Sequence, residues 1–503
     1  MRTPRAPFLP ALLLLGLAAC GAEDGRPPVA APVEVGPEES PGGAEPGDPQ
    51  VPPESARSLS DTVGTLDRFS GAGDEIDLTL TSGMTAPRYR ARFVPGYPGL
   101  VEFVLTNTGT IWVERFLLQM PPTPPPTPAP LLVVFHKFGT GHGDVLNTTF
   151  LAEAQARGWY CMSHTGARQK HFGSNESQIN TRAALELVAH LFPIDRDRVY
   201  GVGFSMGGGA LANYAARHQD PTGVRFAAIV NHTGGVSLAH TWFHEPDDAD
   251  LDDNTPLPGQ NLEVPDILED LFGGPPSAVP FEYQRCSSID LHPIQGTIGA
   301  GTDFARNLFA VPTLTWIASA EPLAYLATQT YAFDGHLQAQ NVAHAFVVAS
   351  GNVHAWTTLD ETAVCDWLQT KTLQTPTAGR TLADENGRWL HFDLEQDAAG
   401  SFTPFTWSID AAARRIELSQ TANLRRVSIH AAAAGVAPPG TMTLGLATAD
   451  GTGDRVRILG VAGAPLAVTR DGLAAGGTYD ALAGTFEIIE TDAARHEWVL
   501  TFP

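Results

Sequence analysis

The chain has 503 residues, a formal net charge of −24 and 43% hydrophobic residues, the composition of a soluble globular protein. This length exceeds one ordinary hydrophobic core, so two or three domains are expected. The acidic balance argues against nucleic acid and anionic membrane surfaces as partners, because both repel a negatively charged protein.

Residues 1–19 have the pattern of an export signal: "MRTPRAPFLPALLLLGLAAC" has two arginines, a short apolar run and small residues before Cys20. The run is too short to span a bilayer. Leu17-Ala18-Ala19-Cys20 resembles the bacterial lipobox, which implies cleavage before Cys20 and lipidation of its sulfur. We therefore expect an exported bacterial lipoprotein, anchored to the envelope (outer membrane or cell surface) through Cys20 only. An ordinary secretory signal with a chance cysteine is the alternative.

Residues 20–58 follow as a tether. They carry nine prolines between Pro27 and Pro53 and almost no large apolar side chains. Such a segment cannot bury enough surface to offset its ordering entropy, so we expect it to be disordered and partly extended.

Residues 59–376 have the pattern of an α/β domain. Short alternating strands come first, and strands then alternate with helices, which predicts a mostly parallel sheet with helices on both faces. The expected strands are 76–82, 89–94, 100–107, 111–120, 131–136, 159–164, 197–204, 225–234, 311–322 and 343–356. The expected helices are 144–158, 177–192, 207–218 and 362–370. Residues 240–305 interrupt this rhythm, and we interpret them as an insertion or lid over the carboxyl edge of the sheet.

Residues 377–503 change character again, to short strands separated by Gly, Asp and Asn turns. This predicts a separate all-β domain of sandwich or barrel type. The expected strands are 388–396, 415–420, 426–432, 441–448, 455–461, 485–491 and 497–503. Nothing in this part indicates catalysis, so we expect a binding or packing module.

Ser205 is the candidate nucleophile. It lies in "GFSMG", between a predicted strand and a predicted helix, where an α/β-hydrolase places its strained serine. The tight turn requires small neighbours, and Gly203, Gly207 and Gly208 supply them. Met206 then directs its backbone N–H into the space beside the serine hydroxyl.

A catalytic serine needs a base, and the base needs an orienting carboxylate. In this fold the acid and then the histidine follow the nucleophile along the chain, in loops after the last two strands. Glu321 and His354 occupy those places. Asp334 is the alternative acid, with Asp360 behind it. The competing histidines are His136, His142, His164, His171, His232, His240, His244, His292, His336 and His344.

The third requirement is an oxyanion hole. We expect one donor from the Met206 N–H and a second from the loop after residues 131–136, at Lys137 or Phe138. No metal or organic cofactor is required for this chemistry.

These segments resemble the secreted esterase branch of the α/β-hydrolases, which includes polyhydroxyalkanoate depolymerases and feruloyl or acetylxylan esterases. The matching pieces, within residues 110–372, are "PLLVVFHKFG", "DRVYGVGFSMGGGALANYAARH", "VPTLTWIASAEPLAY" and "GNVHAW". The resemblance implies an α/β-hydrolase fold, a Ser205–His354–Glu321 triad and hydrolysis of carboxylic esters. Two positions depart from the pattern: Lys137 replaces the usual glycine, and Glu321 replaces the usual aspartate.

Three functions follow as hypotheses. The first is a monomeric serine esterase acting on an extracytoplasmic polyester or acylated polysaccharide. The second is a serine peptidase of the same fold, and the third is a catalytically inactive surface-binding protein, which Lys137 favours. The pairing of Cys161, Cys286 and Cys365 stays open, with a Cys286–Cys365 disulfide as one possibility. The aromatic residues that could line an acyl pocket or belong to the core are Trp242, Phe243, Phe281 and Trp356.

Overall fold

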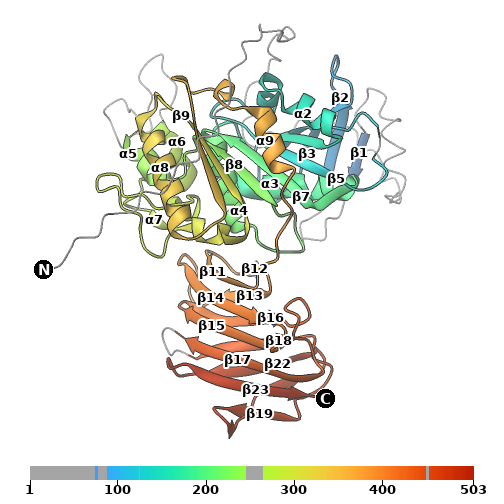
Figure 1. The fold of residues 1–503 in the computed structure, drawn as a ribbon, viewed down its shortest axis with the longest axis vertical. Coiled ribbons are helices and arrows are strands. Elements are labelled where there is room, and N and C mark those ends of the chain that lie inside the picture. Colours follow the sequence, from blue (N-terminus) through green and yellow to red (C-terminus); the bar gives the residue numbers. More distant parts are fainter. Residues whose placement is uncertain (1–73, 78–87, 124, 245–263, 449–452) are drawn as a thin grey trace, which may run out of the picture. The chain divides into compact units, whose positions relative to one another are not determined.

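The computed structural model describes residues 74–77, 88–123, 125–244, 264–448 and 453–503 (Figure 1). The expected signal sequence, lipidated Cys20 and tether lie outside these residues. Within the described residues, no helix is long and apolar enough to cross a membrane. The same residues hold no cluster of three or more His, Cys, Asp or Glu side chains suited to a metal ion.

A ten-stranded sheet forms the first part of the structure, in the order β1-β2-β3-β4-β6-β5-β7-β8-β9-β10. Its strands are β1 (Asp74–Asp77), β2 (Arg88–Phe93), β3 (Leu100–Thr106), β4 (Glu114–Gln119), β5 (Ala129–Phe135), β6 (Tyr160–His164), β7 (Ile194–Phe204), β8 (Ala228–His232), β9 (Thr313–Ala318) and β10 (His344–Ala349).

The sheet is mixed, so the prediction of a mostly parallel sheet is wrong. Strands β1 to β4 form an antiparallel meander, and β4 also pairs antiparallel with β6. Strands β6, β5, β7, β8, β9 and β10 pair in parallel. The reason is connection length: the short loops between β2, β3 and β4 can only reverse the chain, whereas a parallel pair needs a long crossover.

Helices cover both faces of the parallel part (Figure 1). Leu131, Val133 and Phe135 of β5 belong to one apolar cluster. Leu132 and Val134, which point the other way, belong to a second. The first cluster includes side chains of α3 (Asn175–Leu191), α4 (Met206–Arg217) and α8 (Ala324–Ala339). The second includes side chains of α2 (Phe150–Arg157) and α9 (Glu361–Leu368). Both faces of β5 are therefore buried, which explains why its sequence is apolar throughout and does not alternate with polar residues.

Two local predictions need correction. The helix expected over 144–158 is divided into a 3₁₀ helix, η3 (His142–Asn147), and α2. The division falls at Thr148 and Thr149, and the Thr148 hydroxyl donates to the Val145 carbonyl, 2.7 Å away, which competes with continuation of the helix. Helix α8 was not predicted at all.

The insertion contains three short helices among its described residues: α5 (Leu238–His244), α6 (Val264–Phe272) and α7 (Pro280–Arg285). Their apolar side chains pack in one cluster with Phe172 and Met206. Met206 directly follows Ser205, so the insertion packs beside the candidate nucleophile.

The C-terminal part contains two further sheets. One has seven strands in the order β11-β14-β15-β17-β23-β19-β20, and the other has six in the order β12-β13-β16-β18-β22-β21. The strands are β11 (Ala378–Ala383), β12 (Gly387–Trp389), β13 (Phe392–Gln396), β14 (Thr403–Asp410), β15 (Arg415–Thr421), β16 (Leu424–His430), β17 (Gly440–Thr448), β18 (Asp454–Leu459), β19 (Ala467–Arg470), β20 (Leu473–Ala474), β21 (Thr478–Asp480), β22 (Thr485–Glu490) and β23 (His496–Phe502).

Strand β14 was not predicted, although its Phe405, Trp407 and Ile409 alternate with more exposed residues.

The buried Asp384, after β11, forms ion pairs with Arg217 and with Arg285.

The three described cysteines, Cys161, Cys286 and Cys365, are buried free thiols, so a Cys286–Cys365 disulfide is not present. Cys365 packs with Cys161 in the core on one face of the ten-stranded sheet. Cys286 packs with the insertion helices instead, and tertiary placement therefore separates the two.

Candidate active site

The candidate residues follow the carboxyl ends of parallel strands. Lys137 follows β5, Ser205 follows β7, Glu321 follows β9 and His354 follows β10. Parallel strands end at the same edge of a sheet, so these loops meet there, where sheets of this kind place their sites.

Ser205 has a strained backbone, with φ 57° and ψ −122°. Its own N–H donates to the His232 carbonyl at 3.0 Å, and its carbonyl accepts from the amides of Gly208 and Gly235 at 3.0 and 3.1 Å. A Cβ on Gly203 would come within 2.8 Å of the Gly208 nitrogen, which explains the glycine before the turn. Strain of this kind persists only where the surroundings enforce it, and here they do.

His354 and Glu321 form a close pair. His354 Nδ1 lies 3.0 Å from Glu321 Oε1, and the Glu321 side chain is only 2% exposed. Glu321 Oε1 also accepts the Leu323 N–H at 3.1 Å. The two loops are joined by their backbones, because the Ala320 N–H donates to the Gly351 carbonyl at 2.9 Å.

The His354 ring packs against Phe204, the residue before Ser205, with ring centroids 4.5 Å apart. No hydrogen bond joins Ser205 Oγ to His354 Nε2 in this structure. Neither ring nitrogen of His354 makes a hydrogen bond of good geometry among the described residues: Nδ1 is only close to Glu321, and the buried Nε2 atom has no partner. Catalytic hydrogen bonds are often long or poorly aligned until substrate binds, so this geometry leaves Nε2 available.

The rival acids have other neighbours. Asp334 Oδ1 faces His344 Nε2 at 3.7 Å, and His344 begins β10, at the opposite end of that strand from His354. Burial raises the pKa of Asp334. Asp360 caps helix α9 by accepting the Ala363 N–H at 2.9 Å.

Several rival histidines are buried inside the fold. Burial lowers the pKa of His164 and of His232 to about 3, with a smaller effect of the nearby His354 on His232. Burial also lowers the pKa of His136 and that of His171. These rings are therefore neutral near pH 7, and His232 Nε2 is occupied by the Thr358 hydroxyl at 2.8 Å.

The loop after β5 carries the expected oxyanion donors. The His136 ring organises it: Nε2 lies 2.9 Å from the Thr165 carbonyl oxygen, and Nδ1 lies 2.7 Å from the Lys137 carbonyl oxygen and 3.1 Å from the Gly141 nitrogen. Lys137 does not have a positive φ, so a glycine is not required at its position. Its N–H donates to Asp144 Oδ2 at 3.3 Å, whereas the Phe138 N–H has no hydrogen-bond partner among the described residues.

Met206 begins helix α4, so its N–H has no acceptor within the helix. Among the described residues, the backbone amides of Met206 and Phe138, which lie in the two segments expected to supply oxyanion donors, therefore have no hydrogen-bond acceptor.

Asp144 is the residue that the sequence analysis missed. It was expected only as the first residue of a helix, and no local signal separated it from other acidic helix starts. The structure shows its side chain fully buried, between the loop after β5 and the loop that carries His354.

The four aromatic candidates have different surroundings. Trp356 is buried against Phe204 and Phe150. Trp242 packs on the insertion cluster, and Phe243 is 47% exposed. The Phe281 ring packs at a tilt against the ring of Phe402, from the C-terminal part, with centroids 4.8 Å apart.

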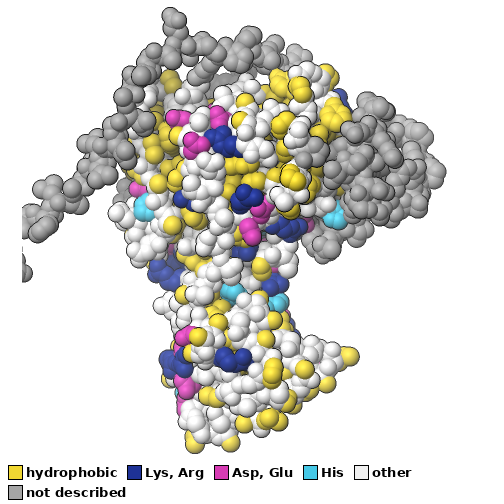
Figure 2. Space-filling model, turned by 45° about the vertical axis from the view of Figure 1, so that its right-hand side comes forward, with side chains coloured by type: hydrophobic (Ala, Val, Ile, Leu, Met, Phe, Trp, Pro, Cys, Tyr) yellow, Lys and Arg dark blue, Asp and Glu magenta, His cyan; other side chains and the backbone are white. Residues whose placement is uncertain are grey.

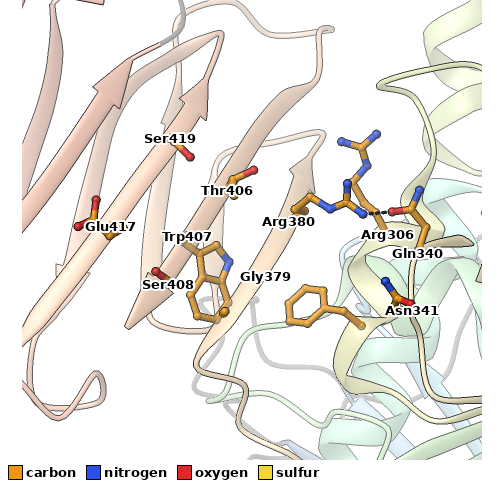
Figure 3. Close-up of a pocket in the computed structure, with 12 residues that line it drawn as sticks. Arg306, Gln340, Asn341, Gly379, Arg380, Thr406, Trp407, Ser408, Glu417 and Ser419 are labelled. Carbon is orange, nitrogen blue, oxygen red and sulfur yellow. Dashed lines mark hydrogen bonds between the residues drawn. The ribbon is translucent and has the colours of Figure 1, made fainter. Parts of the chain in front are cut away.

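One cavity, drawn in Figure 3, has a volume of about 500 Å³. Arg380 donates to Gln340 at this cavity, and Trp407 is among the residues that line it. Trp407 is 2% exposed and donates to Thr381 Oγ1 at 3.1 Å, so it belongs to the core of the C-terminal part. None of Ser205, Glu321 and His354 lines this cavity.

The described residues show mixed charge on the face drawn in Figure 2. Lys and Arg side chains are interspersed there with Asp and Glu side chains rather than gathered in one basic patch (Figure 2).

No protein-family model and no curated protein matches this chain. Among solved structures it is similar to an S-formylglutathione hydrolase from Agrobacterium tumefaciens, with TM-score 0.39 and 11% identity, covering 59% of this chain and 96% of that one. It is similar to an esterase of Pyrobaculum calidifontis, with TM-score 0.36 and 14% identity, covering 62% and 90%. It is also similar to an acetyl xylan esterase from Paenibacillus sp. R4, with TM-score 0.38 and 11% identity, covering 62% and 93%. At these TM-scores the likenesses do not establish an activity for this chain.

Proposed function

We propose that this chain has an α/β-hydrolase fold and is a serine esterase that uses Ser205, His354 and Glu321. The observation that carries the proposal is a strained serine between β7 and α4, at the same sheet edge as a histidine–glutamate pair 3.0 Å apart, in which the glutamate side chain is 2% exposed and the histidine side chain 17% exposed. Strained backbones and paired acid–base groups each lower the stability of the fold. Proteins keep them mainly where the chemistry of a functional site needs them, so they cluster at such sites.

The reaction has two halves. His354 Nε2 takes the proton of the Ser205 hydroxyl as Oγ attacks the ester carbonyl carbon. The tetrahedral intermediate collapses, and the protonated imidazole gives its proton to the leaving alcohol, which leaves an acyl-enzyme. Water then attacks the acyl carbon with His354 as base, and the acid product and free Ser205 are released. Glu321 holds the imidazole in the tautomer with the proton on Nδ1 and stabilises its charged form.

The oxyanion hole in this proposal is formed by the N–H groups of Met206 and Phe138. Lys137 was the alternative second donor, but its N–H is directed to the Asp144 carboxylate. Each such donor contributes about 3 kcal/mol to stabilisation of the transition state.

We further propose that the protein is exported and anchored to the bacterial envelope through a lipid on Cys20, and that it acts as a monomer. Its ester substrate would be an extracytoplasmic polyester or an acylated polysaccharide. Loss of labelling with radioactive palmitate in a Cys20→Ser variant would support the anchor, and unchanged labelling would contradict it.

A fluorophosphonate probe tests the nucleophile. We expect the wild-type protein to be labelled and to hydrolyse p-nitrophenyl esters, and Ser205→Ala to do neither. Equal labelling of the two proteins, or no labelling of the wild type, would overturn the proposal and favour an inactive binding protein. Faster cleavage of aminoacyl anilides than of esters would instead favour a peptidase.

A further inference from the structure

Asp144 lies where two functional loops meet. Its side chain is completely buried, in the 3₁₀ helix η3 that follows the loop after β5. A buried carboxylate is costly unless charged or polar donors surround it. The contacts of Asp144 therefore indicate what the buried charge stabilises.

On one side Asp144 contacts Lys137. Its Oδ2 atom accepts the Lys137 backbone N–H at 3.3 Å, and its Oδ1 atom lies 3.4 Å from the Lys137 ammonium group. The first contact fixes the Lys137 backbone one residue before Phe138, whose N–H is the proposed oxyanion donor, and the second holds the Lys137 side chain. Lys137 thus supplies the counter-ion for a carboxylate that orients the oxyanion loop.

On the other side Asp144 contacts Trp356. The Trp356 indole N–H donates to Asp144 Oδ2 at 2.8 Å, although 212 residues separate the two along the chain. Trp356 lies two residues after His354, and its ring packs on Phe204 with centroids 5.2 Å apart. The same Phe204 ring contacts the His354 ring at 4.5 Å. One oxygen atom of Asp144 therefore links both loops.

We propose that Asp144 is a positioning residue for the esterase reaction: it sets the oxyanion donor of Phe138 through Lys137 and the base His354 through Trp356. This inference rests on the proposed function. A misplacement of about 1 Å in a catalytic group can cost about 100-fold in rate, so loss of this link acts on kcat rather than on ground-state binding of substrate.

Two substitutions separate the contacts of Asp144 from its charge. Asp144→Ala removes every contact, and we expect kcat on a p-nitrophenyl ester to fall about 100-fold with KM changed less than three-fold. Asp144→Asn keeps an amide oxygen that can accept both N–H groups, and we expect it to retain kcat within ten-fold of the wild type.

A third substitution, Trp356→Phe, tests the link to the His354 loop, because it removes only the indole N–H. Its effect on kcat should largely disappear in the Asp144→Ala background, since both changes break the same link.

Asp384→Asn is the matched control, because it neutralises another buried carboxylate, one paired with Arg217 and Arg285 away from the site. We expect it to lower the melting temperature and leave kcat per folded molecule unchanged. The proposal is overturned if Asp144→Ala keeps wild-type kcat, if Asp144→Asn is as impaired as Asp144→Ala, or if the Trp356→Phe and Asp144→Ala effects simply multiply. In each of these cases Ser205-dependent activity of the wild type leaves the esterase proposal intact, whereas a wild type without that activity removes both.

Discussion

Gly207 offers a direct test of how the nucleophile turn is packed. It is the second residue of α4, and a Cβ added there would come within 2.6 Å of the Phe135 carbonyl carbon and would collide with the carbonyl oxygens of Phe135 and His136. Those atoms belong to the end of β5 and the start of the oxyanion loop. The substitution Gly207→Ala therefore pushes the nucleophile turn and the oxyanion loop apart.

The substitution Gly207→Ala has two effects on the free energy of unfolding, and they have opposite signs. Helix propensity alone favours alanine over glycine by about 1 kcal/mol. The steric effect is larger, because 2.6 Å is about 0.8 Å short of ordinary van der Waals contact and the obstructing atoms are backbone. Overpacking of this kind costs about 1–3 kcal/mol. A displacement approaching 1 Å at the oxyanion donors would lower kcat by about 100-fold.

The assay measures kcat on a p-nitrophenyl ester together with the melting temperature. Gly223→Ala is the control, because a Cβ there meets only the Asp220 carbonyl oxygen at 3.6 Å, an ordinary contact. We expect Gly223→Ala to keep wild-type kcat and Gly207→Ala to lose most of it while the protein still folds. Wild-type kcat and an unchanged melting temperature in Gly207→Ala would refute the steric argument.

Two further predictions concern the acid and the buried histidines. Glu321→Gln should lower kcat about 10³-fold, because it removes the charge that orients and stabilises the His354 imidazolium. Asp334→Asn should leave kcat within two-fold of the wild type. If Asp334→Asn instead lowered the rate of ester hydrolysis more than Glu321→Gln, Asp334 would be the acid. The pKa of His232 falls from 6.5 to about 3 in the folded state, so the unfolded chain binds the extra proton between these values. The free energy of unfolding is therefore not reduced by this protonation above pH 6.5. As the pH falls from 6.5 towards 3, it decreases by up to about 1.4 kcal/mol per pH unit. Melting temperatures between pH 8 and 4 should decline less steeply in His232→Gln than in the wild type, and identical slopes would contradict this account.

Strand periodicity and the demands of tight turns could be predicted from the sequence. The apolar run 131–136 indicated a strand covered on both faces, because it lacks polar alternation, and β5 has that environment. The glycines around Ser205 indicated a strand-to-helix turn, because only small residues fit where a strand and a helix make so close an approach. The assignment of Ser205, Glu321 and His354 to catalysis stays a prediction, now joined by a His354–Glu321 separation of 3.0 Å in the structure.

What the sequence determined by itself were the local properties: which segments alternate in polarity, which turns need glycine, and in which order serine, acid and histidine occur along the chain. Only the tertiary structure decided the properties that depend on long-range contact. It made four of the nine strand pairings of the first sheet antiparallel, turned Asp334 towards His344, and brought Asp144 into contact with Trp356. The physical reason is that burial and hydrogen bonding between distant segments depend on where the chain packs, and no local pattern of residues encodes the partner.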